Sequence, residues 1–259
     1  SMYCALTGAE VICLKLAGMP LYDAFIHAFS SAGTGGFSNR NASVGAYNSL
    51  AIEMIITVFI LLFSINFAVY FLILTRRWRE ALRSDELRFF GCVVAGTTLV
   101  ISLANLGVYG GIWESLRYTV FQVASLISTT GFATADFVLW PQFSQLILIL
   151  IMFCGACAGS TGGGMKCSRI LLLFRVIRRG VRRIAHPRAV EVVKLDGKVV
   201  DDSTVHSILL FVGGYLLIIF AAALFISLDG GSFSVSFSAA LTCVSNVGPG
   251  LEVIGPTGN

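Results

Sequence analysis

The sequence predicts an all-α polytopic membrane protein, and three observations support this fold class. Hydrophobic residues make up 56% of the 259 residues and charged residues only 12%, whereas about a quarter of the residues in a soluble domain are charged. Mean hydropathy is +0.84. Long apolar runs alternate with short basic segments, and about 20 apolar residues in a helix cross a hydrocarbon core of about 30 Å. We therefore expect helices that cross the membrane several times.

Five apolar runs are candidates for these helices. The run nearest the start of the chain is the weakest, because Glu10 and Lys15 interrupt it. The fourth run is longer than a single crossing requires. The five runs are 1–17, 49–74, 89–112, 137–174 and 205–228.

Basic residues set the expected orientation of the chain. Of the 18 Lys and Arg residues, five lie in 75–88 and eight in 175–198. Connectors rich in Lys and Arg stay in the cytoplasm, so we expect 75–88 and 175–204 to be cytoplasmic. Basic runs also occur in nucleic-acid-binding proteins, but these runs flank apolar spans, which favours a role in membrane topology. We therefore expect the lipid bilayer, and no nucleic acid, as a partner.

One segment between the two connectors must enter the membrane and return. The apolar segments there are 89–112, 114–129 and 137–174, and three full crossings would put the second connector outside. The middle segment has 16 residues, which reach only about 24 Å as a helix. We therefore expect 114–129 to form a half-helix followed by a re-entrant loop. Such a loop must be enclosed by protein or line a watery cavity, since unpaired backbone groups are costly in lipid.

A short glycine-containing unit occurs three times. Gly36, Gly131 and Gly248 mark its copies, which are spaced by 95 and 117 residues. Each copy follows a short apolar run, and recurrence of this kind indicates one supersecondary module used several times. The module consists of a span, a half-helix, a glycine loop and a second span. The short apolar runs are 22–29, 118–127 and 233–243, and the loops are SAGTGGFS (31–38), STTGFA (128–133) and SNVGPG (245–250).

Loops of this kind are typical of ion selectivity filters, in which backbone carbonyls from several loops replace the water around an ion. Glycine permits the backbone conformations that aim carbonyls at one axis, and the C-terminal ends of the half-helices favour a cation there. Simple glycine turns between helices are the alternative, which accounts for one loop more readily than for three. The predicted ion-binding residues of the filter are Thr34, Gly35, Gly36, Phe37, Thr129, Thr130, Gly131, Phe132, Asn246, Val247, Gly248 and Pro249.

The motifs of this chain resemble those of the Trk/Ktr/HKT superfamily of potassium transporters, and the chain is most similar to the bacterial Trk-type potassium-translocating subunit. The resemblance covers essentially the whole chain and rests on GTGGFS (33–38), STTGFATAD (128–136), GACAGSTGGGMK (155–166) and SNVGPG (245–250). It implies repeated units around a pseudo-fourfold ion pore, with potassium at the filter carbonyls. It also implies potassium uptake across a bacterial inner membrane, a homodimer, and a cytoplasmic nucleotide-binding regulatory subunit of the RCK type. No cofactor and no enzymatic activity are expected.

The resemblance also assigns the repeats. Residues 1–75 match the second repeat with an incomplete first span, 89–174 the third with a broken second helix, and 205–259 the fourth without its last span. The connectors between them are 76–88 and 175–204. We therefore expect the chain to be a fragment of a longer transporter that does not conduct alone. In the resembling family the loop of the first repeat strongly influences the selectivity between potassium and sodium. Because the chain matches only the second to fourth repeats, sodium stays an alternative ion.

A glycine-rich run interrupts the apolar segment 137–174. As one helix this segment would span about 57 Å, and consecutive glycines do not sustain a helix. We expect two half-helices joined by a loop beneath the filter, and the resemblance assigns that loop the role of a gate. Lys166 is expected to pair with a carbonyl of the loop, to repel ions, or to reach the cytoplasmic interface together with Arg169. The gate residues are Gly159, Ser160, Thr161, Gly162, Gly163, Gly164 and Lys166.

Other functions suggested by single motifs have weaker support. A phosphate-binding Walker loop needs Gly-Lys followed by Ser or Thr, but Met165 follows Gly164. Cys154 and Cys157 have the C-x-x-C spacing of metal and redox sites, yet no second pair accompanies them, which favours apolar packing. An intramembrane enzyme with Ser160 or a cysteine as nucleophile would need a nearby base, and the sequence offers no histidine or carboxylate beside Ser160.

A non-conducting membrane sensor is a further alternative to a transporter, because a filter sequence does not by itself prove conduction. Asp136, just beyond the loop at 128–133, is a candidate for attracting cations to the outer mouth, or it is a solvated loop residue. Glu53 and Asn66 lie in an apolar span, where polar side chains often join helices. We therefore assign neither of them to the pore.

Overall fold

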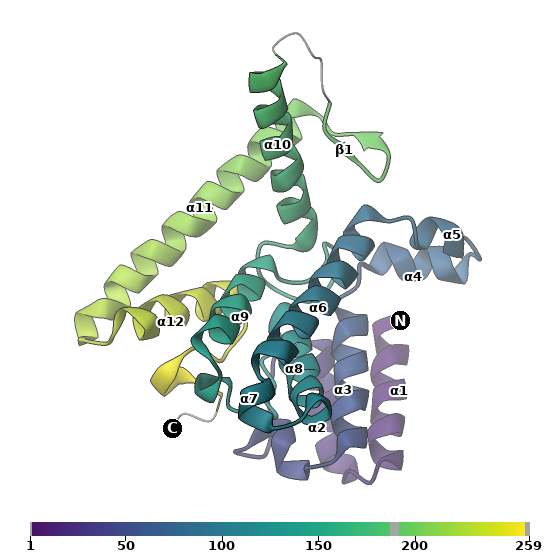
Figure 1. The fold of residues 1–259 in the computed structure, drawn as a ribbon. Coiled ribbons are helices and arrows are strands. Elements are labelled where there is room, and N and C mark those ends of the chain that lie inside the picture. The colour runs from purple at the N-terminus through teal and green to yellow at the C-terminus, as the bar shows by residue number, and fades with distance from the viewer. Residues whose placement is uncertain (1, 187–191, 257–259) are drawn as a thin grey trace.

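The computed structural model describes residues 2–186 and 192–256, which are mostly helical (Figure 1). The fold class predicted from the sequence is confirmed. The helices are α1 (Met2–Leu16), α2 (Leu21–Ala32), α3 (Leu50–Phe63), α4 (Phe67–Leu74), α5 (Trp78–Ala81), α6 (Asp85–Ala104), α7 (Leu106–Tyr109), α8 (Ile112–Ile127), α9 (Gln142–Cys154), α10 (Cys167–Ala185), α11 (Asp202–Ile226) and α12 (Phe233–Ser245). Single 3-10 turns lie at Ser43–Tyr47, Phe137–Leu139, Ser227–Asp229 and Glu252–Ile254, and the short strands are β1 (Lys194–Leu195) and β2 (Lys198–Val199).

The strands form a small antiparallel hairpin within the predicted connector 175–204, in which Lys194 lies opposite Val199. Residues 187–191 of the same connector lie outside the described residues. So do residue 1 and residues 257–259 of the predicted second and fourth repeats.

One predicted span is bent. Among the described residues, α6 and the helix Asp202–Asp229 are long and apolar enough to cross a membrane, and α3 with α4 would make a third if the pair counted as one span. However, the chain bends by 92° between α3 and α4, so the prediction of a continuous span at 49–74 is wrong. Asn66 explains where α4 begins, because its side-chain oxygen accepts the N–H of Ala68 at 2.9 Å and so caps the helix.

The other helices agree with the predicted segments to within a few residues at most ends. α6 begins before residue 89 and ends at Ala104, and Asn105 separates it from the short α7, so the span 89–112 is shifted and shortened. The expected break in 137–174 is present between α9 and α10. α10 runs past residue 174 to Ala185, since Arg and Leu are good helix formers. The first part of the connector 175–204 is therefore helical.

Buried apolar side chains of the described residues form two clusters, and α8 contributes to both. One cluster joins α8 to α9 and α12, and the other joins it to α1, α2 and α3. Residues 121–127, the last seven of α8, are all buried. The C-terminal part of the half-helix predicted at 114–129 is thus enclosed by protein, as a re-entrant segment requires.

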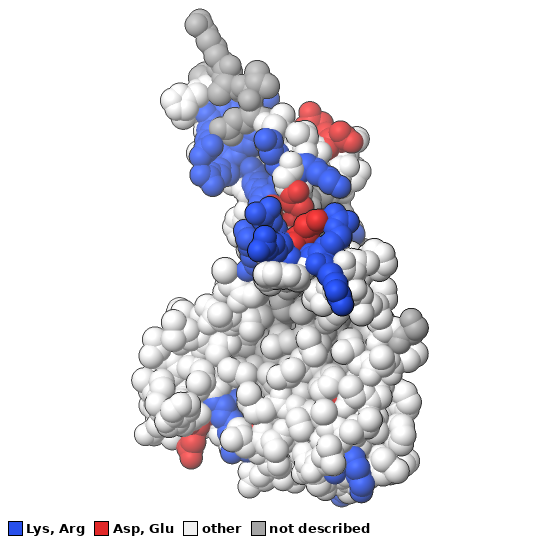
Figure 2. Space-filling view, turned by 90° about the vertical axis from the view of Figure 1, so that its right-hand side faces the viewer, with Lys and Arg blue, Asp and Glu red and all other residues white. Residues whose placement is uncertain are grey.

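Charged side chains gather at one end of the molecule. In Figure 2, Lys and Arg form a dense group over the end that carries α10 and the β1–β2 hairpin, above a broad band that is almost free of charge. A band of this kind suits the bilayer core. The sequence predicts, from the positive-inside rule, that this basic end faces the cytoplasm.

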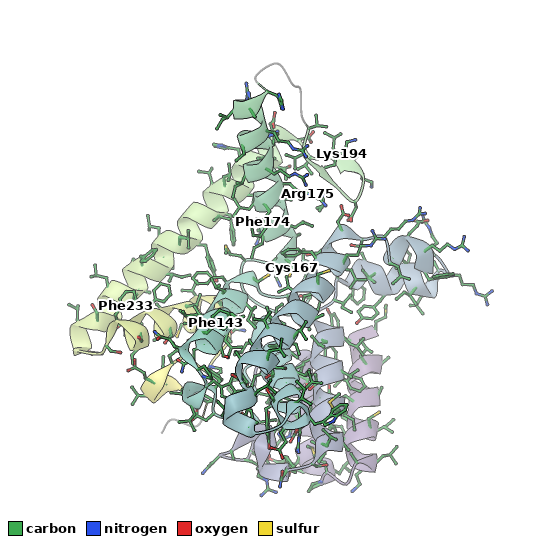
Figure 3. All side chains as sticks on the ribbon, viewed as in Figure 1. Phe143, Cys167, Phe174, Arg175, Lys194 and Phe233 are labelled. Carbon is green, nitrogen blue, oxygen red and sulfur yellow. The ribbon has the colours of Figure 1, made fainter. Side chains whose placement is uncertain are left out.

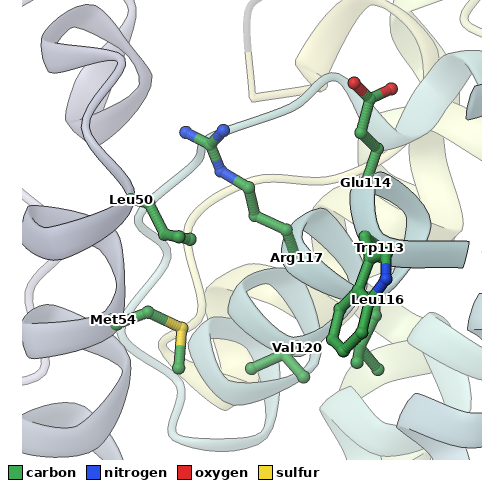
Figure 4. A pocket seen from close by; sticks show the side chains of 7 residues that line it. All are labelled: Leu50, Met54, Trp113, Glu114, Leu116, Arg117 and Val120. Atoms are coloured by element: carbon green, nitrogen blue, oxygen red, sulfur yellow. The ribbon is translucent and has the colours of Figure 1, made fainter.

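A buried ion pair holds α8 against α3. The Nε and one terminal nitrogen of Arg117 donate to the two carboxylate oxygens of Glu53, both at 2.7 Å. The Glu53 side chain is 3% exposed and that of Arg117 is 24% exposed. Arg117 lies at the edge of an apolar cavity of about 420 Å³ that includes Met54 and Val120 (Figure 4). Glu53 therefore joins two helices, as its position in a span suggested.

Replacing Glu53 by Gln should lower the stability of the fold, because Arg117 would keep its charge without a partner. Removing one member of a fully buried pair costs about 3–5 kcal/mol, and the partial exposure of Arg117 reduces our expectation to about 1–3 kcal/mol. The melting temperature in detergent measures the effect. Glu114→Gln is the matched control, because Glu114 is an exposed acid in the first turn of α8, the helix of Arg117. Equal melting temperatures for the two variants would contradict this role of Glu53.

Candidate functional site

The half-helices α2, α8 and α12 end at the three glycine loops with the same backbone motif. In each loop one non-glycine residue has a left-handed conformation, with φ of 49° at Thr34, 58° at Thr129 and 59° at Asn246. The N–H of that residue bonds to the carbonyl three residues earlier, and the next N–H bonds to the carbonyl five residues earlier, which is a Schellman cap. The bonds are Thr34 to Ser31 (3.2 Å), Gly35 to Ser30 (2.8 Å), Thr129 to Leu126 (3.1 Å), Thr130 to Ser125 (2.9 Å), Asn246 to Cys243 (3.3 Å) and Val247 to Thr242 (2.9 Å).

After its cap, each loop turns back along its own half-helix. In the second loop, the side-chain nitrogen of Gln122 donates to the carbonyl of Ala135 at 2.9 Å, so the chain has returned to the level of a residue before the cap. The turn back predicted after residue 128 is therefore present. The corresponding contacts in the other loops are His27 Nε2 with Ser38 Oγ at 3.1 Å and Leu251 N–H with Ser238 Oγ at 3.1 Å.

The aligned glycines bring neighbouring loops into contact. Gly36, Gly131 and Gly248 have φ of 66°, 86° and 104°, where a side chain is strained. A Cβ on Gly36 would lie inside contact distance of the Thr130 carbonyl, and a Cβ on Gly131 would lie equally close to the Val247 carbonyl. Thr130 and Val247 occupy the same position in their caps. Gly36 and Gly131 thus face the same carbonyl of the next loop, whereas a Cβ on Gly248 would meet no heavy atom within 4 Å.

The phenylalanines that follow the aligned glycines are not equivalent. Phe132 is fully buried and stacks on His27, with ring centroids 5.5 Å apart. Phe37 is 76% exposed. The structure therefore brings the predicted filter residues together through their backbones, while these two side chains have different surroundings.

A glycine-rich loop, residues 155–166, lies against the ends of all three half-helices. The N–H of Gly163 donates to Thr129 Oγ1 at 2.6 Å, and Thr34 Oγ1 donates to the carbonyl of Thr161 at 3.3 Å. A Cβ on Gly163 would lie inside contact distance of the Ser245 carbonyl at the end of α12. The loop thus lies directly beneath the residues predicted to form the filter, and it brings the predicted gate residues into contact with them.

Lys166 interacts with the loop 155–166 itself. Its Nζ donates to the carbonyl of Gly162 and, at 3.4 Å, to that of Ser160. Of the three arrangements expected for Lys166, the structure contains the pairing with loop carbonyls. Arg169 lies instead over the ring of Phe211, with its guanidinium carbon 4.0 Å from the ring centroid.

The cysteines considered for metal or redox sites, Ser160 considered as a nucleophile, and Asp136 all make contacts that stabilise the fold. Cys154 and Cys157 are buried, and Cys154 Sγ lies 3.6 Å from Cys167 Sγ rather than facing the other cysteine of the C-x-x-C motif. The hydroxyl of Ser160 donates to the carbonyl of Cys157 at 2.6 Å. The carboxylate of Asp136 accepts the N–H of Val138 at 3.0 Å and so caps the 3-10 turn that follows the second loop.

Sequence reasoning missed a hydrogen-bonded cluster around the carboxylate of Asp23, which contacts residues just after the first loop. Asp23 accepts hydrogen bonds from Tyr47 (2.6 Å), Asn39 (2.5 Å) and Arg40 (3.2 Å). The hydrogen bond from Tyr47 is the main cause that lowers the pKa of Asp23, and those from Asn39 and Arg40 act in the same direction. An acid in the first turn of a half-helix is the only local signal, and its partners follow 16 to 24 residues later.

Sequence reasoning also missed Glu86, whose carboxylate touches the loop 155–166 from another helix. Its Oε1 accepts the N–H of Ala158 at 2.6 Å and that of Ser168 at 3.0 Å. The available signal was an acid that immediately precedes a predicted span, which by itself is also typical of the first turn of any helix.

Comparison with known proteins gives one consistent result. A family model described as TrkH, cation transport protein, matches residues 10–254. The Trk system potassium uptake protein TrkH of Salmonella typhimurium is 36% identical over 262 residues, which cover 98% of this chain and 53% of that protein. The Trk system potassium uptake protein TrkG of Escherichia coli is 34% identical over 251 residues, which cover 96% of this chain and 52% of that protein.

The fold agrees with that of a solved relative. The crystal structure of the potassium transporter TrkH from Vibrio parahaemolyticus matches with a TM-score of 0.92 and 35% sequence identity, over 98% of this chain and 55% of the other. The chain thus spans about half the length of the relatives it matches.

Proposed function

Because this chain belongs to the TrkH family of cation transport proteins, we propose that it contributes three filter loops to a pore that carries potassium across a membrane. Residues 1–75, 89–174 and 205–259 are the second, third and fourth repeats of that pore, joined by the connectors 76–88 and 175–204. The observation that carries the proposal is the shared cap of the three loops, in which two of the aligned glycines, Gly36 and Gly131, face equivalent carbonyls of the next loop.

Electrostatics at the loops favours a cation. The C-terminal end of each half-helix carries about half a negative charge, and α2, α8 and α12 all end at the glycine loops. Backbone carbonyls, not carboxylates, then replace the water around the ion, which is how potassium filters bind their ion. The residues 34–37, 129–132 and 246–249 supply these carbonyls. Aligned glycines keep side chains out of the contacts between loops.

The loop 155–166 is the gate of the proposed pore. Its residues 159–164 lie beneath the filter loops and hydrogen-bond to Thr34 and Thr129. The ammonium group of Lys166 engages the loop carbonyls, so it neutralises groups that would otherwise attract a cation. Opening then requires the loop to leave these contacts, and a segment rich in glycine is suited to such a movement.

The alternatives from the sequence are weaker. The curated relatives are potassium uptake proteins. The Ser160 hydroxyl donates a hydrogen bond to a backbone carbonyl, which leaves the intramembrane enzyme without a nucleophile activated by a base. A membrane sensor differs from the proposed transporter only in failing to conduct, so the transport measurement below separates the two.

We propose that the protein lies in a bacterial inner membrane with residues 75–88 and 175–204 in the cytoplasm. The basic group over α10 and the hairpin supports this orientation. A cytoplasmic nucleotide-binding subunit of the RCK type is the proposed regulator, and α10 with the hairpin is the part of the described chain that it would reach. In Figure 3, Arg175 of α10 lies near Lys194 of the hairpin, to whose carbonyl it donates a hydrogen bond.

The apolar stripe of α10 supports the proposed homodimer. Four of its apolar side chains recur at helical spacing and are between 54% and 83% exposed, and a stripe of this kind on a helix outside the membrane is typical of a protein contact. These residues are Phe174, Ile177, Val181 and Ile184.

Potassium uptake tests the proposed function. The complete reading frame is expressed, together with its regulator, in bacteria that lack potassium uptake, and uptake is measured at low external potassium with sodium in excess. We expect potassium to enter and sodium not to compete. Absence of uptake, with the protein detected in the membrane, would favour the sensor, and preferential sodium uptake would overturn the assignment of the ion.

A further inference from the structure

The loop 155–166 is held at both of its ends by one side chain. Glu86 lies in the first turn of α6 and is 5% exposed. A single oxygen, Oε1, accepts the N–H of Ala158 near the start of the loop and that of Ser168 just after its end. The two donors are ten residues apart in the sequence, so Glu86 fixes the width of the loop.

The surroundings of Glu86 stabilise its charge through N–H groups. Ser168 lies in the first turn of α10, whose preceding residue Lys166 offers no side-chain cap, so Glu86 supplies that cap from another helix. Its other oxygen, Oε2, accepts the side-chain N–H of Asn66 at 3.4 Å, at the bend between α3 and α4. Within residues 2–186 and 192–256, the ion pairs do not include Glu86. Its contacts are therefore directional and depend on the positions of these backbone groups.

The preceding residue, Asp85, is tied to the cytoplasmic hairpin. Its N–H donates to the carboxylate of Asp196 at 2.6 Å, and its own carboxylate accepts the N–H of Asp196 at 2.9 Å. Asp196 lies in the turn between β1 and β2. Arg175 of α10 pairs with Asp85 at 3.0 Å and also donates to the carbonyl of Lys194. Adjacent residues of one helical turn thus contact the hairpin and the loop 155–166.

We propose that Glu86 is the positioning residue of the loop 155–166, and that Asp85 couples this loop to the β1–β2 hairpin. Because both residues belong to the first turn of α6, a displacement of the hairpin moves Glu86 and, with it, both ends of the loop. A cytoplasmic partner that binds the hairpin would in this way act on the loop without touching it. Only this last consequence, control of ion flow, rests on the proposed function.

Hydrogen exchange in the complete protein tests the positioning role of Glu86 directly. In Glu86→Ala, amide exchange in residues 155–168 should be at least about tenfold faster, which corresponds to about 1.4 kcal/mol of lost protection. Residues 121–127, the buried end of α8, should keep their rate. Glu86→Gln retains an acceptor oxygen, so its exchange rate in residues 155–168 should lie between that of wild type and that of the alanine variant. Unchanged exchange in 155–168, or acceleration spread evenly over the protein, would overturn the proposal.

The coupling requires a second variant. Asp85→Ala removes the side-chain contacts to Asp196 of the hairpin and to Arg175 of α10 but none to the loop 155–166, yet it should accelerate exchange both in residues 193–200 and in residues 155–168. The control is Glu114→Ala, another acid in the first turn of a helix, which should change neither segment. Acceleration confined to 193–200 would show that the hairpin and the loop are independent, and would overturn the coupling.

Ion flux from the same preparations separates this inference from the proposed function. In proteoliposomes without the cytoplasmic regulator, Glu86→Ala should raise rubidium flux severalfold while the preference for potassium over sodium stays unchanged. If wild type and variants carry no flux but the exchange results are as expected, the proposed function fails and the positioning role of Glu86 stands. If flux is normal and exchange in 155–168 is unaffected by Glu86→Ala, the positioning role of Glu86 fails and the proposed function stands.

Discussion

Replacing Gly131 by Ala is expected to reduce potassium uptake by the complete protein at least about tenfold. Gly131 has φ of 86°, where an L-residue costs roughly 1–2 kcal/mol. The added Cβ would also lie inside contact distance of the Val247 carbonyl and 3.1 Å from Cδ of Pro249. Since Val247 is a predicted ligand of the ion, its carbonyl would have to turn away from its place in the filter. A change of about 1.4 kcal/mol in the barrier already corresponds to a factor of ten.

Uptake at low external potassium in uptake-deficient bacteria measures this effect. Gly91→Ala is the matched control, because Gly91 lies within α6 and a Cβ there would meet no heavy atom within 4 Å. We expect the control to transport normally and residual uptake by Gly131→Ala to discriminate poorly against sodium. Wild-type uptake by Gly131→Ala, at equal protein levels in the membrane, would remove the main support for a filter at this loop.

Replacing Gly163 by Ala should raise ion flow in the absence of the regulator, with little change in the choice of ion. A Cβ on Gly163 would lie inside contact distance of the Ser245 carbonyl and 3.2 Å from Cβ of Asn246. The loop 155–166 then cannot stay in its observed place against α12. The filter loops keep their own caps, which involve only residues within each half-helix and its loop. We therefore expect a severalfold increase in open probability.

Single-channel recording of the complete protein gives open probability and selectivity in one experiment. Gly180→Ala in α10, where a Cβ would meet no heavy atom within 4 Å, is the control. Gly162→Ala offers an independent variant, since its Cβ would lie 2.6 Å from that of Ala156 and 2.8 Å from the Ser128 carbonyl. A Gly163 variant with altered selectivity and unaltered gating would place this residue in the filter instead.

The half-helices and their loops could be predicted because their signals are local. The segment 114–129 is too short to cross the membrane, and Gly36, Gly131 and Gly248 recur after similar apolar runs. The glycines are necessary at these positions, since two of them approach a neighbouring carbonyl closely. The interruption of 137–174 was visible for the same reason, as consecutive glycines weaken a helix wherever they occur.

The features that sequence reasoning missed depend on partners far away in the chain. The bend before α4 follows from Asn66, which caps that helix. In the sequence, however, a capping Asn looks the same as a polar residue inside a continuous span. Glu86 bonds to residues 72 and 82 positions later, and Arg117 finds Glu53 64 positions earlier. Hydropathy and spacing describe segments one at a time, so they cannot identify such pairs.

The caps of the filter loops also bear on the order in which the protein folds. Each cap closes bonds over three to five residues, so it can form as soon as its half-helix does, at little cost in chain entropy. The loop 155–166 instead depends on bonds across 34, 72 and 127 residues, which exist only after the helices have assembled. The proposed gate is therefore the last part of the ion path to form and, on heating, the first to be lost. A partly melted protein would be expected to leak before it loses its preference among ions.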